Sequence, residues 1–236
     1  MRVAALADVH GNAPALEAVL AEVEAQRPDL IVFCGDLTWG PLPAETYELV
    51  RGLDALHVRG NAERALFEPQ DRERARWIVE RHRPALLEFA SSFAEHHVVE
   101  VDGLGPTRFV HGSPRSDEEL VTAETEPARV REFLAGVPER AVVTAHTHVS
   151  YVREVDGVRL LNAGSVGLPY EGRPGAYWAM LGPGVEHRRT EYDLDAALER
   201  MGAAGFPGWD EYAELLRSPP TPAEVIADAE ERVFAG

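Results

Sequence analysis

Five short apolar runs, rich in valine, leucine, isoleucine and phenylalanine, are each followed closely by aspartate, asparagine or histidine. Their length and composition predict buried β-strands at residues 3–7, 30–34, 55–58, 107–110 and 141–145. In open sheets that alternate with helices, ligands bind at the carboxyl ends of the strands. The pattern therefore predicts one polar site assembled from five separate strand ends.

The polar residues at these ends form a set of seven. In "LADVHGN", Asp8 and His10 are two residues apart, and such positions of an extended segment project to the same side. Each strand end taken alone has an ordinary explanation as a cap or turn, but five together indicate a site. The set is Asp8, His10, Asp36, Asn61, His111, His146 and His148, accompanied by Gly11, Gly35, Gly60 and Gly112.

The residue types in this set favour a pair of metal ions. Seven ligands are too many for one tetrahedral zinc, and the absence of thiolates does not suit a structural zinc site. Imidazole mixed with carboxylate and amide oxygen suits divalent manganese, iron, cobalt, nickel or zinc. Two-metal hydrolytic sites hold their ions roughly 3.5–4 Å apart, with one ligand shared between them.

The remaining pattern predicts a mixed α/β fold with strands in two sheets, because a parallel β-α-β start is followed by hairpins. Asn12 is a good N-cap for the first helix, and Thr221 with Glu224 forms a capping box for the last. Helices are expected at 12–26, 43–53, 127–137, 193–201 and from 221, with two more in 64–96 broken near Pro84; hairpins are expected at 98–110, 150–165 and 175–193.

Composition narrows the function classes. The 236 residues, 45% hydrophobic and 27% charged, suit one sizeable domain. The net charge of −17 opposes unspecific attraction to nucleic acid or to an anionic membrane. The single cysteine, Cys34, is expected to be a small buried apolar residue. Neither a signal sequence nor an 18-residue apolar run is recognisable, so we expect a cytoplasmic protein without a membrane partner.

The order and character of five sequence blocks resemble the calcineurin-like metallophosphoesterases, and within them the small bacterial and archaeal phosphodiesterase branch. The blocks are Asp8-Val9-His10, Gly35-Asp36, Gly60-Asn61, His111-Gly112 and Ala145-His146-Thr147-His148, supported by "ADVHGNAPALEAVL", "CGDLTWGP" and "NAGSVGLP". The resemblance implies a four-layer α/β/β/α sandwich of two mixed β-sheets flanked by helices. It covers residues 1–192, with a helical insertion at about 64–96, and leaves 193–236 as a C-terminal helical extension packed on the same domain.

By the same resemblance, the chain hydrolyses phosphoesters, with phosphodiesters of small molecules as the expected substrates. A water or hydroxide that bridges two divalent ions would attack phosphorus in line, and Mn²⁺ is the ion expected to support activity in vitro. The implied catalytic residues are Asp36, Asn61 and His111. The implied first metal set is Asp8, His10, Asp36 and His148, and the second is Asp36, Asn61, His111 and His146, so that Asp36 is shared.

Two positions depart from the family pattern. The usual Gly-Asn-His-Asp/Glu here reads Gly60-Asn61-Ala62-Glu63, so the histidine that would protonate the leaving group is missing. Ala145 replaces a glycine before the last histidine pair, which only adds a methyl group at the strand end.

Several other polar or aromatic residues are better explained by structure than by chemistry. Asn12 is expected to cap a helix rather than to contact substrate, and Ser113 and Ser165 are expected to be turn residues. Trp39 and Tyr170 are expected to pack within loops rather than to stack on a substrate. Glu63 and Arg64 fit equally a first-turn helix role and a role supporting ligands or phosphate. The histidines outside the five blocks are expected to be structural or exposed: His57, His82, His96, His97 and His187.

Other readings of the same residues stay open. One is a non-catalytic metal-binding scaffold on this fold, although all seven ligand positions hold a suitable residue, which favours catalysis. A protein or nucleotide phosphatase is another, and a nuclease is disfavoured by the charge of −17 and the lack of a basic stripe. The sequence specifies neither the physiological substrate nor the oligomeric state.

Overall fold

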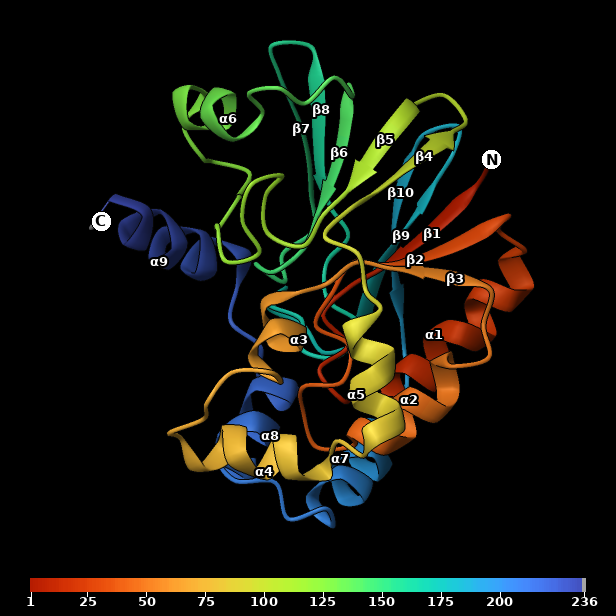
Figure 1. The fold of residues 1–236 in the computed structure, drawn as a ribbon, viewed down its shortest axis with the longest axis vertical. Helices are drawn as coiled ribbons and strands as arrows, with labels where there is room; N and C mark the ends of the chain where they lie inside the picture. Colours follow the sequence, from red (N-terminus) through yellow and green to blue (C-terminus); the bar gives the residue numbers. More distant parts are fainter. Residues whose placement is uncertain (235–236) are drawn as a thin grey trace.

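The computed structural model describes residues 1–234 and contains two five-stranded sheets (Figure 1). The first is made of β1 (Val3–Leu6), β2 (Leu30–Phe33), β3 (Ala55–His57), β9 (Ala176–Leu181) and β10 (Val185–Thr190), in the order β10-β9-β1-β2-β3. The second is made of β4 (His97–Val101), β5 (Gly105–Phe109), β6 (Ala141–Thr144), β7 (Tyr151–Val155) and β8 (Val158–Asn162), in the order β4-β5-β6-β8-β7.

The two sheets pack face to face, and helices cover their outer faces. Alternate residues of β1 divide between two cores: Val3 and Ala5 join Val143 and Leu161 of the second sheet, whereas Ala4 and Leu6 pack under helices. The helices are α1 (Ala13–Gln26), α2 (Pro43–Val50), α3 (Asn61–Ala65), α4 (Glu73–Arg81), α5 (Pro84–Ser91), α6 (Pro127–Phe133), α7 (Leu194–Gly202), α8 (Trp209–Arg217) and α9 (Pro222–Phe234). The expected four-layer α/β/β/α sandwich is confirmed.

Parallel pairing brings the carboxyl ends of several strands together. In the first sheet, Leu6 of β1 pairs with Phe33 of β2, and Phe33 pairs with His57 of β3. In the second, Phe109 of β5 pairs with Val143 of β6. Because these registers align the strand ends, the segments that follow β1, β2, β3, β5 and β6 all leave the sheets at one edge.

The helices differ from expectation in two places. The two helices expected in the segment 64–96 are present as α4 and α5, and an additional short helix, α3, precedes them from Asn61, directly after the turn that follows β3. Pro84 does start α5, as predicted. Helix α8 was not predicted, although Trp209, Tyr212 and Leu216 have helical spacing.

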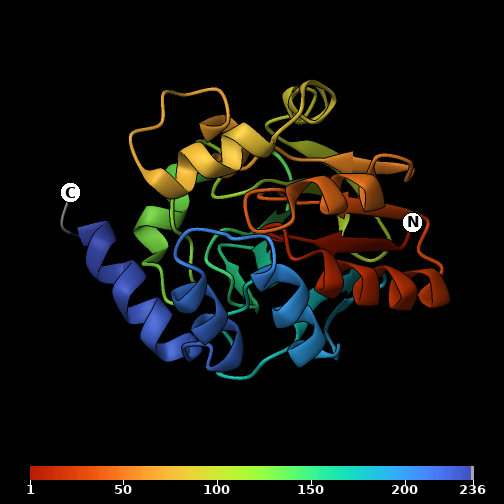
Figure 2. The same ribbon diagram turned by 90° about the horizontal axis from the view of Figure 1, so that it is seen from below.

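The C-terminal helices share a core with the rest of the chain. Leu198 and Met201 of α7 and Leu216 of α8 cluster with Ala13 of α1 and with Leu42. Figure 2 shows these helices in blue along one side of the molecule. The domain boundary expected at residue 192 stays a prediction. Among the described residues, no helix combines the length and apolarity needed to cross a membrane.

Replacing Val143 by alanine should lower the free energy of unfolding by about 2 kcal/mol, because two methyl groups between the sheets are lost and leave a cavity. Val152 on β7 is 47% exposed, and Val152→Ala is the matched control with an expected change within about 0.5 kcal/mol. Urea denaturation with an unchanged m-value measures both. Equal losses would contradict the placement of Val143 between the sheets.

Candidate metal centre

Six of the predicted site residues form two compact groups at the common edge of the strands. Asp8, His10 and His148 form one group, and Asp36, His111 and His146 form the other. Within each group the potential ligand atoms all lie within 4.8 Å of one another. The seventh residue joins the second group, because Asn61 Oδ1 lies 2.9 Å from Nε2 of His111. The structure thus brings all seven residues together.

The backbone at this edge is strained in a localised way. Among the described residues, seven that are not glycine have a positive φ angle, and five of them belong to the site. A left-handed conformation costs a residue with a side chain about 1 kcal/mol or more, so it persists only where the surroundings enforce it. It turns the chain sharply after β1, β2 and β6. The five are Asp8, His10, Asp36, His146 and His148.

Three imidazoles are oriented by backbone carbonyls. Nδ1 of His10 lies 3.2 Å from the carbonyl oxygen of Trp39, and Nδ1 of His148 lies 2.6 Å from that of Leu168. Nδ1 of His111 lies 2.8 Å from the carbonyl oxygen of Cys34. A carbonyl only accepts hydrogen bonds, so Nδ1 carries the proton in each ring. In the neutral form of each ring, the Nε2 lone pair then faces the cluster, which is the arrangement found in metal-bound histidines.

Asp36 lies between the two groups. Its Oδ2 is 3.7 Å from Nε2 of His10, whereas its Oδ1 is 3.5 Å from Nε2 of His111. The backbone N–H of Ala62 donates to Oδ1 at 2.9 Å and fixes the carboxylate in this orientation. One side chain therefore presents an oxygen to each group, as a shared ligand must.

Glu63 holds the Asp36 turn in place. Its buried carboxylate accepts hydrogen bonds from the backbone N–H groups of Asp36, Leu37 and Gly60 at 2.7–2.9 Å. Burial and the nearby Asp36 raise the pKa of Glu63 to about 7. The sequence left two roles open for Glu63, and the structure combines them. The residue lies in the first turn of α3, and from there it holds the loop that carries Asp36.

The charges within the cluster oppose one another strongly. Burial disfavours the charged form of Asp8, yet the imidazole of His148 lowers the pKa of this carboxyl below its usual range. Burial acts in the same way on Asp36, where His111 lowers the pKa well below the usual range. Against its own burial, His111 has its pKa raised by Asp36 to about 10. Burial and His111 lower the pKa of His146 to about 4. The two carboxylates therefore stay ionised only with positive charge nearby, and the imidazole of His146 is neutral at pH 7.

Two details show that the residues fit a cation. Oδ1 of Asp8 is buried and has no hydrogen-bond partner. Nε2 of His10 and Nε2 of His148 face each other at 3.1 Å, and both rings carry their proton on Nδ1. This contact needs either a proton or a metal cation at the Nε2 atoms, and against its own burial Asp8 raises the pKa of His148. Imidazole nitrogen with carboxylate oxygen is a donor set for divalent transition metals.

Most of the other candidate residues have structural roles. Asn12 caps α1 through the N–H of Ala15 and donates to the carbonyl of Gly167, so it is a cap, as predicted. The hydroxyl of Ser165 donates to the carbonyl of Asp8 at 2.7 Å, and this residue is fully buried. Ser113 accepts from two backbone N–H groups of its own turn. Neither serine is a nucleophile.

The two aromatic candidates differ. Trp39 packs against the core that contains the C-terminal helices. Tyr170 stacks on His148, with ring centroids 4.7 Å apart and an angle of 22° between the planes. The sequence analysis missed Tyr212 of α8, whose hydroxyl donates to the carbonyl of His10 at 3.2 Å. The helical spacing of the apolar residues around it was the available signal.

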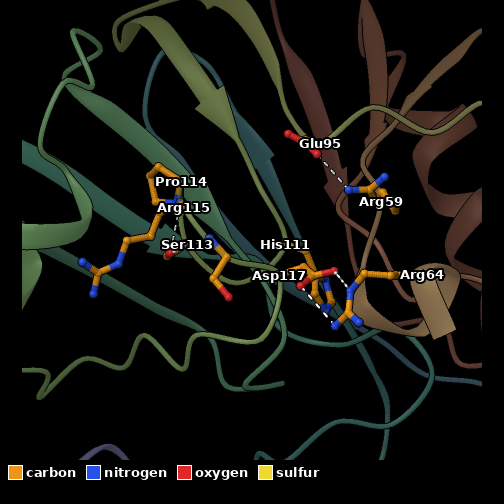
Figure 3. A pocket seen from close by; sticks show the side chains of 9 residues that line it. Arg59, Arg64, Glu95, His111, Ser113, Pro114, Arg115 and Asp117 are labelled. Atoms are coloured by element: carbon orange, nitrogen blue, oxygen red, sulfur yellow. Dashed lines mark hydrogen bonds and ion pairs between the residues drawn. The ribbon is translucent and has the colours of Figure 1, made fainter. Parts of the chain in front are cut away.

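A cavity of about 230 Å³ opens next to His111 and is lined by three arginines, Arg59, Arg64 and Arg115 (Figure 3). Carboxylates hold each of them: Arg59 pairs with Glu95 at 2.9 Å and Arg64 with Asp117 at 2.8 Å. Arg64 therefore lies at the rim of the site as part of a charged network. Because carboxylates pair with all three arginines, and Glu95 and Asp117 also line the cavity, its wall is a network of opposite charges rather than a positive patch.

The comparisons with known proteins agree with this geometry. The family model described as calcineurin-like phosphoesterase superfamily domain matches residues 1–181. The chain belongs to this superfamily. It is therefore a metal-dependent hydrolase by family, as the sequence predicted, and its two candidate ligand groups are of the kind that such enzymes require.

Individual relatives extend the likeness over nearly the whole chain. A metallophosphoesterase from Sphaerobacter thermophilus is 27% identical, with a TM-score of 0.76, and the match covers 92% of this chain and 98% of that one. A hypothetical protein from Pyrococcus horikoshii OT3 has the same fold, with 18% identity, a TM-score of 0.80 and coverage of 93% and 99%. An uncharacterised protein of Methanocaldococcus jannaschii is 25% identical over 88% of this chain and 94% of its own length.

Gly60→Ala should weaken metal binding about 10- to 100-fold, because the added Cβ would lie 2.1 Å from Oδ1 of Asp36. Gly60 has a φ of −91°, which alanine adopts freely, so the effect is steric alone. Gly52→Ala is the matched control, since nothing lies within 4 Å of its Cβ. Titration calorimetry with Mn²⁺ measures both affinities. Equal affinities would show that the position of Asp36 does not govern binding.

Proposed function

We propose that the chain is a dinuclear-metal phosphoesterase that hydrolyses phosphodiesters of small molecules. The observation that carries the proposal is the position of Asp36, which presents one oxygen to each of the two candidate ligand groups. Asp8, His10 and His148 would hold one divalent cation with Asp36. Asn61, His111 and His146 would hold the other with the same carboxylate.

Two cations bound there would polarise a phosphoryl oxygen and lower the pKa of an attacking water. The residues of the chain supply the arrangement. Asp36 keeps the two groups in register, and Asn61 and His111, 2.9 Å apart, present an amide oxygen and an imidazole nitrogen side by side. The carbonyls behind the imidazoles prevent the rings from turning, so the ligand atoms are preorganised before substrate binds.

The surroundings of the centre favour a diester over a monoester. The arginine-lined cavity borders His111, and a second cavity of about 450 Å³ borders His146. A diester carries two organic groups on one phosphorus, and the two cavities that border the ligand group of His111 and His146 offer room for both. The net charge of −17 disfavours long polyanions such as nucleic acids and favours small substrates.

Metal content tests the proposal first. We expect up to two transition-metal ions per chain by elemental analysis, loss of hydrolysis after chelation, and recovery on adding Mn²⁺. The loaded protein should then be screened against phosphomonoesters, phosphodiesters and pyrophosphates. Full activity without any metal would refute the proposal, and bound metal without turnover of any ester would support the scaffold alternative.

Asp36→Asn should lower kcat/KM at least about 100-fold, since one change weakens the hold on both cations. Asn12→Ala is the comparison: it removes the cap of α1 and costs about 1 kcal/mol of stability, with a smaller loss of activity. Kinetics at saturating Mn²⁺ and thermal unfolding separate the two effects. Similar activity losses would contradict the shared role of Asp36.

The residue at position 62 predicts how the rate responds to the leaving group. A positioned general acid contributes about 10²–10⁴-fold, and Ala62 has no proton to give. We therefore expect the rate to fall steeply as the leaving-group pKa rises, from nitrophenyl to alkyl diesters. Ala62→His should flatten the dependence, whereas Ala65→His on the same helix α3 should not. A shallow slope in the unaltered protein would mean that another group already donates the proton.

A further inference from the structure

The cavity beside His146 is built in large part by the C-terminal helices. Leu215 of α8 and Val225 and Ala229 of α9 line it, opposite Thr147 and Tyr170 of the loops that follow β6 and β8. Its volume of about 450 Å³ lies in the range of roughly 300–1,000 Å³ that small-molecule sites occupy. His146, a candidate metal ligand, is one of its lining residues.

Helix α9 is fixed in this position by buried contacts. One carboxylate oxygen of Glu230 accepts from the hydroxyls of Thr122 and Thr125 at 2.6 and 2.8 Å. Ala229 is buried, and the predicted capping box between Thr221 and Glu224 is formed at the start of the helix. These contacts connect the helical wall of the cavity to the loop that contains Thr122 and Thr125.

The lining of this cavity contrasts with that of the arginine-lined cavity. Five of its eleven lining residues are leucine, valine, alanine or proline, the ring of Tyr170 adds a planar face, and Glu224 is a further charged residue of the lining. That ring is already held by stacking on His148. The charged residues Asp228 and Arg232 are exposed at the rim and pair with each other at 2.7 Å. An uncharged flat group fits such walls, and contact with an aromatic ring adds to the gain from burial.

We infer that this cavity binds an aromatic ester group of the substrate, linked to phosphorus through oxygen. The inference rests on the proposed function, because the phosphorus is placed at the metal centre and the cavity begins at His146. The aromatic group lies between Tyr170 and α9, and the C-terminal helices thereby select the substrate.

The test compares two uncleavable ligands, phenylphosphonate and methylphosphonate, which differ only in the group on phosphorus. Titration calorimetry with the full, Mn²⁺-loaded chain should show about tenfold tighter binding of phenylphosphonate, since burying the ring removes apolar surface from water. Val225→Phe fills the cavity and should reduce the preference to less than about threefold. Ala227→Phe is the matched control on the exposed side of α9 and should keep the preference.

A second variant guards against misfolding. Leu215→Phe narrows the same cavity from α8, and unchanged Mn²⁺ stoichiometry confirms that each variant is folded. Equal binding of the two phosphonates, binding of neither, or equal effects of Val225→Phe and Ala227→Phe would overturn the inference. If diesters are hydrolysed in those cases, the proposed function stands. If no ester is hydrolysed but the phenyl preference is present and is lost in Val225→Phe, the cavity assignment stands and the proposed function fails.

Discussion

The structure depends on an electrostatic constraint: two aspartates are buried among four imidazoles at one edge of a double sheet. Asp8 and Asp36 are almost completely removed from water, and Oδ1 of Asp8 has no hydrogen-bond partner. Buried charge is strongly destabilising unless it is compensated, and left-handed backbone at the same positions adds strain. Divalent cations would relieve the first of these costs. The second is sustained by the surrounding hydrogen bonds, among them the N–H of His10 to the carbonyl of Asp36 at 2.9 Å.

That sustaining framework is a set of backbone interactions between loops. Glu63 ties the turn after β2 to the turn after β3, and the N–H of Asp8 donates to the carbonyl of Gly35 at 3.1 Å. Gly60 lies so close to Asp36 that no side chain fits between them. Glu63 holds the backbone N–H of Asp36, while Gly60 and the N–H of Ala62 lie against the carboxylate of Asp36. These contacts fix the orientation in which its two oxygens face the two ligand groups.

The strand ends and their polar residues were predictable from the sequence, because apolar runs and the residues that follow them are local patterns. The hydrogen-bond partners of Glu63 and the contact of Tyr212 were not. Glu63 acts on N–H groups of two different loops, and Tyr212 acts on a carbonyl 202 positions earlier in the chain. Such contacts depend on how distant segments pack, which no short pattern encodes. The separate helix α3 was missed for a related reason: its first residue, Asn61, was read only as a ligand.

The candidate metal ligands come from local patterns at strand ends, whereas the proposed selectivity depends on contacts between distant segments. The match to the family model ends at residue 181, yet two later helices reach the site. Tyr212 of α8 contacts the backbone of His10, and α9 forms the wall opposite Tyr170. The candidate ligands follow strands that are fixed by sheet ladders, whereas the wall is fixed by a few side-chain contacts such as those of Glu230. A change in α8 or α9 can therefore alter which organic group fits beside the centre while the ligand atoms stay where the strand ends place them.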